Sequence, residues 1–164
     1  MKNKVKILYL RILECVFKLF RKDPMKIQLD RYRLYGVNIG DNVRAFSPIT
    51  SAEPYLISVG DNVTVSTGVR FITHDNSVIK IYDDATDVVG SIKIGSNCFI
   101  GANAIILPGV EIADDCVIGA GSVVCKSCNT CGAVLAGNPA KVIGSTELMR
   151  NKYFPYRFNF AGGG

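Results

Sequence analysis

The sequence predicts an all-β domain, a parallel β-helix built from six-residue repeats and preceded by helices. The main observation is a run of branched aliphatic residues at strict six-residue spacing: Ile94, Ile100, Ile106, Ile112, Ile118 and Val124. Small or β-branched residues follow four positions later, at Cys98, Ala104, Val110, Cys116, Ser122 and Cys128. Many positions between them are Gly, Asn or Asp, which tolerate the backbone angles of tight corners. Such units, with about six residues to a side, stack into a triangular coil.

Composition limits what the chain can do. It has 164 residues, of which 48% are hydrophobic, enough for one compact domain with a core. Its net charge of +5 is too small to indicate a nucleic-acid partner. The single histidine, His74, excludes mechanisms that need two or three imidazoles. Any histidine chemistry therefore depends on His74.

Residues 1–35 form a predicted N-terminal helical segment. Within residues 4–22, basic residues recur along one side and apolar residues cover most of the remainder. This pattern predicts a helix with a wide apolar face that ends before Pro24, followed by a shorter helix over about 25–34. Two interpretations of residues 1–22 stay open. The helix packs on the domain or on a sister subunit, or it docks peripherally on the inner face of a membrane.

Six cysteines raise the question of export and disulfides. The N-terminus is basic, but it has no uninterrupted apolar core and no small-residue cleavage site. Charged residues also interrupt it too often for a segment that spans a bilayer. We therefore expect a cytoplasmic protein with free thiols, which is peripheral at the inner membrane face if the helix docks there.

Residues 36–145 form the predicted β-helix domain. The phase of the aliphatic run continues upstream at Ile39, Ala45, Val59, Val65 and Phe71. Fourteen residues separate Ala45 from Val59, and 23 separate Phe71 from Ile94. Neither spacing is a multiple of six, so each interval contains a segment that leaves the repeat. In the longer interval we expect an inserted loop at about 74–91.

Residues 146–164 form a predicted C-terminal tail. It is rich in aromatic residues, at Tyr153, Phe154, Tyr156, Phe158 and Phe160. We expect so aromatic a run to find a partner rather than remain in water. Three partners stay open: the coil itself, the entrance of a binding site, or a membrane shared with the N-terminal helix.

Four segments together resemble the hexapeptide-repeat acyltransferases: Ile94–Ala102, Leu107–Val110, Ile118–Val124 and Ala136–Ile143. The resemblance covers about residues 36 to 145. It is closest to the galactoside, maltose and serine acetyltransferases and to the capsule or lipopolysaccharide sugar O-acetyltransferases. It implies a left-handed β-helix and a homotrimer in which acetyl-CoA and the acceptor meet between neighbouring subunits. The six-residue spacing alone does not determine the left-handed winding, which runs against the usual right-handed crossover.

His74 lies where the inserted loop leaves the coil. Acetyl transfer from a thioester to a hydroxyl needs a base, and an imidazole suits that task at neutral pH. In the resembled family, a histidine at this position is the general base. Transfer would then be direct, with backbone N–H groups stabilising the oxyanion and no acyl-enzyme. Asp75 and a backbone carbonyl are equally able to orient the ring, so neither is assigned that role.

The resemblance also implies residues that contact CoA. Ala102 and Ala120 match small residues that flank the pantetheine arm. The Cys125–Lys126 pair replaces a usual Thr-Lys pair, so a hydroxyl contact is lost while the cation remains. Lys141 matches a basic residue near the nucleotide phosphates. Gly144 stands where the family often has a further basic residue, which leaves that contact open.

The cysteine spacing Cys125-x2-Cys128-x2-Cys131 superficially matches the start of an iron–sulfur motif. Leu135 stands where the fourth cysteine would be, and the repeat phase directs only Cys128 inward. Together with the single histidine, this predicts no metal site. Cys98, Cys116 and Cys128 are expected to be small core residues rather than nucleophiles.

The sequence therefore predicts an acetyl-CoA-dependent O-acetyltransferase that acts on a sugar, either nucleotide-linked or lipid-linked, or on a polysaccharide precursor. Two alternatives stay open. One is an acetyltransferase for an amino sugar or a serine-like small molecule, and the other is a non-catalytic β-helix that serves as an interaction module. The sequence does not identify the acceptor, because acceptor pockets of this kind are built from loops that share no motif.

Overall fold

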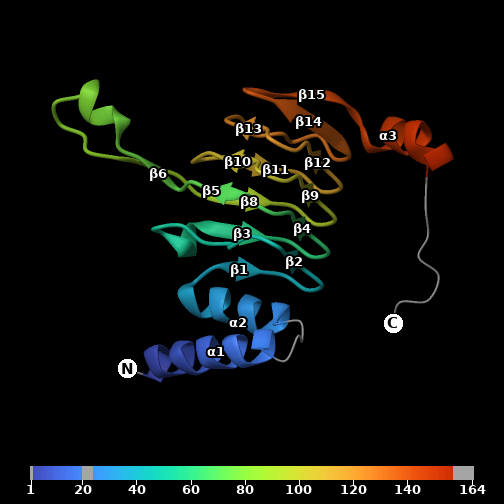
Figure 1. Ribbon diagram of the computed structural model, residues 1–164. Coiled ribbons are helices and arrows are strands. Elements are labelled where there is room, and N and C mark those ends of the chain that lie inside the picture. The colour runs from blue at the N-terminus through green and yellow to red at the C-terminus, as the bar shows by residue number, and fades with distance from the viewer. Residues whose placement is uncertain (1, 20–23, 157–164) are drawn as a thin grey trace.

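The computed structural model describes residues 2–19 and 24–156 (Figure 1). A stack of short strands forms the body of the molecule, with two helices across its N-terminal end. An inserted loop projects from one side of the stack, and a short helix follows the last strand at the opposite end. No helix in the described ranges is long and apolar enough to cross a membrane.

Three sheets make up the stack, and their strands pair in parallel except at the C-terminal end of the second sheet. The first sheet contains β1 (Asn38–Ile39), β3 (Ile57–Val59), β8 (Ile92–Ile94) and β11 (Glu111–Ile112). The second contains β2 (Arg44–Ala45), β4 (Thr64–Val65), β9 (Phe99–Ile100), β12 (Val117–Ile118), β14 (Ala133–Gly137) and β15 (Ala140–Ser145). The third contains β5 (Arg70–Phe71), β10 (Ile105–Ile106) and β13 (Val123–Val124). The chain visits the sheets in turn, so each circuit is one coil, as the six-residue period predicts.

The strand register explains both interruptions of the repeat. Phe99 pairs with Val117, 18 residues later, which is one regular coil of three sides. Arg44 pairs with Thr64, 20 residues later, because the first coil carries two extra residues. Thr64 pairs with Phe99, 35 residues later, because the inserted loop leaves the second coil before the third begins.

The predicted aliphatic column is the core. Ile100, Ile106 and Ile118 have no exposed surface, and the remaining members of the column are at most 7% exposed. The partners four positions later are buried as well, including Ala104 and Ser122 at 0%. Stacked from coil to coil, the column forms one continuous apolar interior.

One corner of the coil is stabilised by a ladder of side-chain amides. Asn42, Asn62, Asn97 and Asp115 all adopt positive φ, which asparagine and aspartate tolerate better than most residues. Each amide donates to its counterpart on the next coil, at 3.2 Å, 3.1 Å and 3.2 Å in sequence. The residues that make the turn therefore also hold successive coils in register.

Two helices close the N-terminal end. α1 (Lys2–Leu19) packs on α2 (Met25–Tyr35), whose Leu29 and Tyr32 are buried in the core. Gly36, with φ of 106°, ends α2 and directs the chain into the first coil. Residues 20–22 of the predicted first helix lie outside the described residues.

The C-terminal end departs from the predicted parallel coil. β15 runs antiparallel to β14, because the chain reverses after Gly137, whose φ of 106° suits glycine. α3 (Thr146–Tyr153) follows, with its first turn capped by the Ser145 hydroxyl, and a 3-10 turn (Phe154–Tyr156) continues it. The aromatic residues of this segment are exposed, at 49% to 81%, and the segment lies at the opposite end of the stack from α1. Phe158 and Phe160 lie outside the described residues.

Candidate active site

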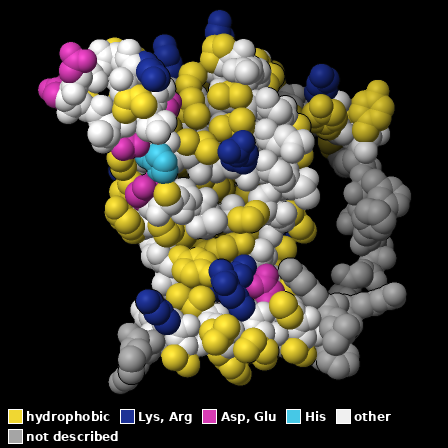
Figure 2. All heavy atoms as spheres, turned by 60° about the vertical axis from the view of Figure 1, so that its left-hand side comes forward, with side chains coloured by type: hydrophobic (Ala, Val, Ile, Leu, Met, Phe, Trp, Pro, Cys, Tyr) yellow, Lys and Arg dark blue, Asp and Glu magenta, His cyan; other side chains and the backbone are white. Residues whose placement is uncertain are grey.

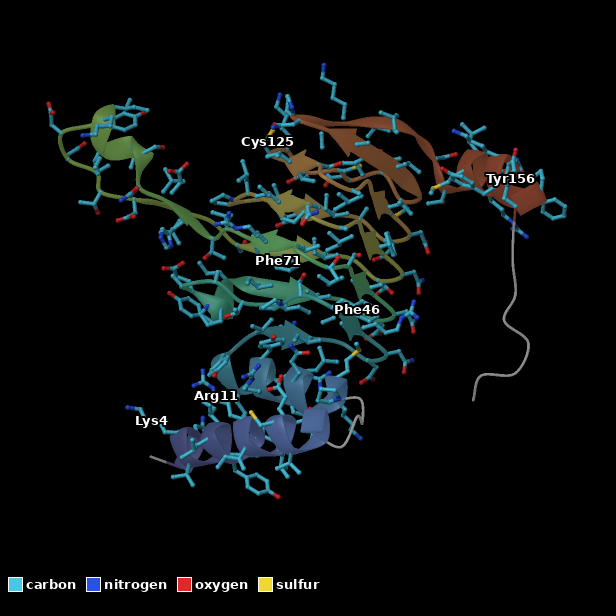
Figure 3. All side chains as sticks on the ribbon, viewed as in Figure 1. Lys4, Arg11, Phe46, Phe71, Cys125 and Tyr156 are labelled. Atoms are coloured by element: carbon cyan, nitrogen blue, oxygen red, sulfur yellow. The ribbon has the colours of Figure 1, made fainter. Side chains whose placement is uncertain are left out.

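His74 begins the inserted loop. It lies in β6 (His74–Asp75), which pairs antiparallel with β7 (Val88–Val89) to form the base of the loop. A 3-10 turn (Ser77–Lys80) occupies the part beyond. Phe71, three residues before His74, is buried in the coil, and Figure 3 labels it beside the point where the loop leaves. The histidine is thus anchored to the buried coil and is itself partly exposed.

Glu53 holds the imidazole ring. Its Oε2 lies 2.9 Å from Nδ1 of His74, and the same oxygen accepts a 2.6 Å hydrogen bond from the hydroxyl of Thr73. The Thr73 hydroxyl, which is buried, also lies 2.7 Å from the hydroxyl of Ser51. Glu53 precedes a 3-10 turn (Pro54–Leu56) in the coil below. Thr73 therefore orients the Glu53 carboxylate, and the carboxylate in turn orients the His74 ring.

These contacts set the protonation of the pair. The hydrogen bond to Glu53, and then the Glu53 charge, raise the pKa of His74 above its ordinary value. The hydrogen bonds from Thr73 and then from His74 lower the pKa of Glu53. An ionised Glu53 favours the tautomer with its proton on Nδ1, which leaves Nε2 to accept a proton.

Asp75 does not orient the ring. Its carboxylate instead accepts a hydrogen bond from the backbone N–H of Ser77 at 2.8 Å, within the turn that follows. No backbone carbonyl takes the role either, because Nδ1 faces Glu53. Sequence reasoning missed Glu53. With 20 residues in the first coil, position 53 stacks below position 73, but that register is not visible in the six-residue pattern.

A hollow opens beside the imidazole. It has a volume of about 300 Å³ and is lined by Ser51, Ala52, Phe71, Ile72, Thr73 and His74. The His74 side chain is 41% exposed. Figure 2 shows the histidine at the surface with acidic side chains beside it. A hydroxyl-bearing molecule can thus approach the ring from solvent.

The small residues expected to contact CoA lie at a different edge of the prism. Ala102 and Ala120 follow strands of the second sheet and occupy equivalent corners of successive coils, where Gly121 N–H donates to the Ala102 carbonyl at 2.7 Å. Ala136 continues this small-residue surface above Gly119. Lys141 of β15 pairs in register with Ala136 and is exposed. Ala102, Ala120 and Lys141 therefore belong to one edge, between the second and third sheets.

The Cys125–Lys126 pair lies elsewhere. It follows β13 of the third sheet, at the edge where the chain returns to the first sheet, and both residues are exposed. His74 also follows a strand of the third sheet and leaves the prism at this edge. Figure 3 labels Cys125 above Phe71 on that side. One protomer thus divides the predicted site residues between two edges.

The inward cysteines are structural. Cys98, Cys116 and Cys128 are buried, and burial raises the pKa of the Cys98 thiol to about 12. Cys116 has a raised pKa for the same reason. Thiols of this kind are poor nucleophiles at neutral pH. Among the described residues, no group of histidine, cysteine and acidic side chains is arranged to hold a metal ion.

Comparison with known proteins gives consistent matches. The family described as bacterial transferase hexapeptide (six repeats) matches residues 91–126. Protein CapG of Staphylococcus aureus is 48% identical over 143 residues, which cover 82% of this chain and 81% of CapG. The galactoside O-acetyltransferase of Escherichia coli strain K12 is 36% identical over 126 residues, covering 75% of this chain and 62% of that protein. The crystal structure of a maltose O-acetyltransferase from Clostridium difficile 630 aligns with a TM-score of 0.58, at 27% identity and over 88% of each chain.

Proposed function

The chain belongs to the hexapeptide-repeat acetyltransferase family, and from that premise we propose that it transfers an acetyl group from acetyl-CoA to a hydroxyl group of a sugar. It is an acetyl-CoA-dependent acyltransferase. Two of its relatives are named for O-acetylation of a galactoside and of maltose, which supports a saccharide acceptor. We expect the reaction to take place in the cytoplasm, where acetyl-CoA and sugar precursors are both found.

In the proposed mechanism His74 is the general base. With its proton on Nδ1 directed at Glu53, the ring accepts the acceptor's hydroxyl proton at Nε2. The hydroxyl oxygen then attacks the thioester carbonyl, so that a C–O bond forms and the C–S bond breaks. The departing thiolate takes the proton from the imidazolium. Between these two proton transfers Glu53 stabilises the imidazolium, since its hydrogen bond and its charge raise the pKa of His74.

The residues at the second edge fit the donor. Ala102 is half-buried and Ala120 is exposed, so an extended pantetheine arm can lie close to the backbone there. Lys141 at that edge and Lys126 at the His74 edge are exposed cations suited to phosphates. We propose that these residues and Cys125 contact CoA, with backbone N–H groups of the coil stabilising the oxyanion.

The division between two edges supports a homotrimer. His74 leaves the prism at one edge, while Ala102 and Ala120 lie at another, one sheet width away. Threefold packing of prisms brings different edges of neighbouring subunits together. We propose that each active site combines the His74 edge of one subunit with the Ala120 edge of the next. The coils are proposed to wind left-handed, as in the family that the sequence resembles.

The observation that carries the proposal is the Glu53–His74 pair beside the hollow. The test measures thiol release from acetyl-CoA with maltose, a galactoside, a nucleotide sugar, an amino sugar and serine as separate acceptors. We expect release that depends on a sugar hydroxyl. Release with serine alone, or only N-acetylation of the amino sugar, assigns the alternative acceptor class. No release with any acceptor contradicts the enzymatic proposal.

A further inference from the structure

Helix α1 is the outermost element at the N-terminal end, where it runs across the stack (Figure 1). A buried ion pair sets its orientation. Glu14 is 5% exposed, and its carboxylate lies 3.2 Å from the guanidinium of Arg31 on α2. Ile7 and Leu10 are partly buried on the same side of the helix. Because an unpaired buried charge is costly, this ion pair opposes rotation of α1 on α2.

The opposite face of α1 is apolar and has no partner in the chain as described. It consists of Val5, Leu8, Tyr9, Ile12 and Val16, which are 40% to 67% exposed. At about 100° per residue these positions fall within an arc of about 100°. A continuous apolar stripe of this kind is unusual on a protein that stays in water. We refer to these five residues as the outer stripe.

Basic side chains flank the outer stripe on both sides. Lys4 and Arg11 lie along one side of α1, where Figure 3 labels them, and the helical phase puts Lys6 on the other. All three are exposed. The only acidic residue between positions 2 and 19 is Glu14, which faces α2. The outward surface of α1 therefore combines apolar and positive groups without a compensating negative charge on that helix.

We propose that α1 docks the protein end-on onto an anionic lipid surface. The outer stripe would enter the boundary between headgroups and acyl chains, while Lys4, Lys6 and Arg11 reach lipid phosphates. A second copy of the chain is a poorer occupant, because face-to-face pairing of two such helices would bring the same positive charges together. Docking is independent of acetyl transfer, so the two proposals can fail separately.

The experiment uses the full chain and sedimentation with two kinds of vesicle. One contains only phosphatidylcholine, and the other also contains phosphatidylglycerol. We expect binding to the anionic vesicles that weakens as salt rises.

Ile12→Asp should reduce the partition coefficient at least tenfold. The variant with Lys4→Gln and Arg11→Gln should lose about fivefold per charge on anionic vesicles only. Ile81→Asp, a change at a more exposed isoleucine of the inserted loop (71% against 55% for Ile12), is the control and should bind normally.

Two results would overturn the proposal. One is equal sedimentation of the unchanged chain and Ile12→Asp, with circular dichroism confirming that both are folded. The other combines two findings: the unchanged chain binds no vesicles, and it forms an oligomer larger than the trimer, which the Ile12→Asp substitution breaks down to the trimer. That result would assign the outer stripe to a second copy. His74→Ala should bind vesicles like the unchanged chain, which separates docking from catalysis.

Discussion

Glu53 and His74 lie in different coils, 21 positions apart in the chain, and yet a carboxylate oxygen of one is 2.9 Å from Nδ1 of the other. Each belongs to an interruption of the repeat: Glu53 to the extra residues of the first coil, and His74 to the base of the inserted loop. The regular coils carry the core, while the two departures from regularity meet and form the candidate catalytic pair.

Replacing the proposed base is the first test. His74→Ala should lower kcat by about a hundredfold to ten-thousandfold, the usual contribution of a positioned general base. The KM for acetyl-CoA should change little, because His74 is not among the proposed CoA contacts. Steady-state thiol release measures both constants. A variant that keeps the full rate with the best acceptor would exclude His74 as the base.

Removing the Glu53 charge should change the pH profile. His74 acts as a base only when neutral, so kcat/KM is lost as pH falls through its raised pKa. Glu53→Gln removes the main cause of that raised pKa, so the acidic limb should move to lower pH while the maximal rate falls. Asp75→Asn is the matched control, because Asp75 contacts Ser77 rather than the ring and its charge raises the pKa of His74 less than Glu53 does, so the limb should move less. An unchanged limb for Glu53→Gln would contradict the assigned role.

Mixed trimers test whether the site is shared between subunits. His74→Ala and Ala120→Trp should each inactivate a uniform trimer, the second by blocking the pantetheine surface. Co-assembly should restore about a quarter of the sites, because an intact His74 edge then meets an intact Ala120 edge by chance. Activity of the mixture, with hybrid trimers identified by native mass, measures this. No recovery would mean that one subunit supplies both edges.

The aliphatic column should carry much of the stability. Ile106 is fully buried, so Ile106→Ala should lower the free energy of unfolding by about 2–5 kcal/mol. Ile79, which is 48% exposed in the inserted loop, is the matched control, and Ile79→Ala should cost about 0.5 kcal/mol or less. Denaturant unfolding at one protein concentration compares them. Similar costs for both changes would argue against the column as the core.

Alkylation distinguishes the two classes of cysteine. Iodoacetamide should modify Cys15, Cys125 and Cys131, which are exposed, in the folded protein at pH 8. It should leave Cys98, Cys116 and Cys128 unmodified until the chain is denatured, since burial both covers them and raises the pKa of Cys98 to about 12. Peptide mass mapping identifies the modified sites. Rapid native labelling of Cys98 would contradict its place in the core.

Much of the coil follows from local pattern alone. The burial of Ile94 and Ile100 and the inward direction of Cys116 are confirmed, because a six-residue side returns every sixth side chain to the same interior. Glu53 could not be predicted, since its place depends on how two extra residues are accommodated in the first coil. The outward direction of Ile12 depends on the Glu14–Arg31 ion pair, a long-range contact that helical periodicity does not contain.

The asparagine ladder requires the length of the stack to change in whole coils. Because Asn42, Asn62 and Asn97 bond to their counterparts at the same corner, coils can be added only as whole circuits, whereas a partial coil would break the ladder. Each added coil would lengthen the molecule by about 5 Å, the spacing between neighbouring strands. His74 leaves the second coil, so its height above α1 changes only in steps of this size. A chain of this design can adjust the reach of its proposed base without altering that residue.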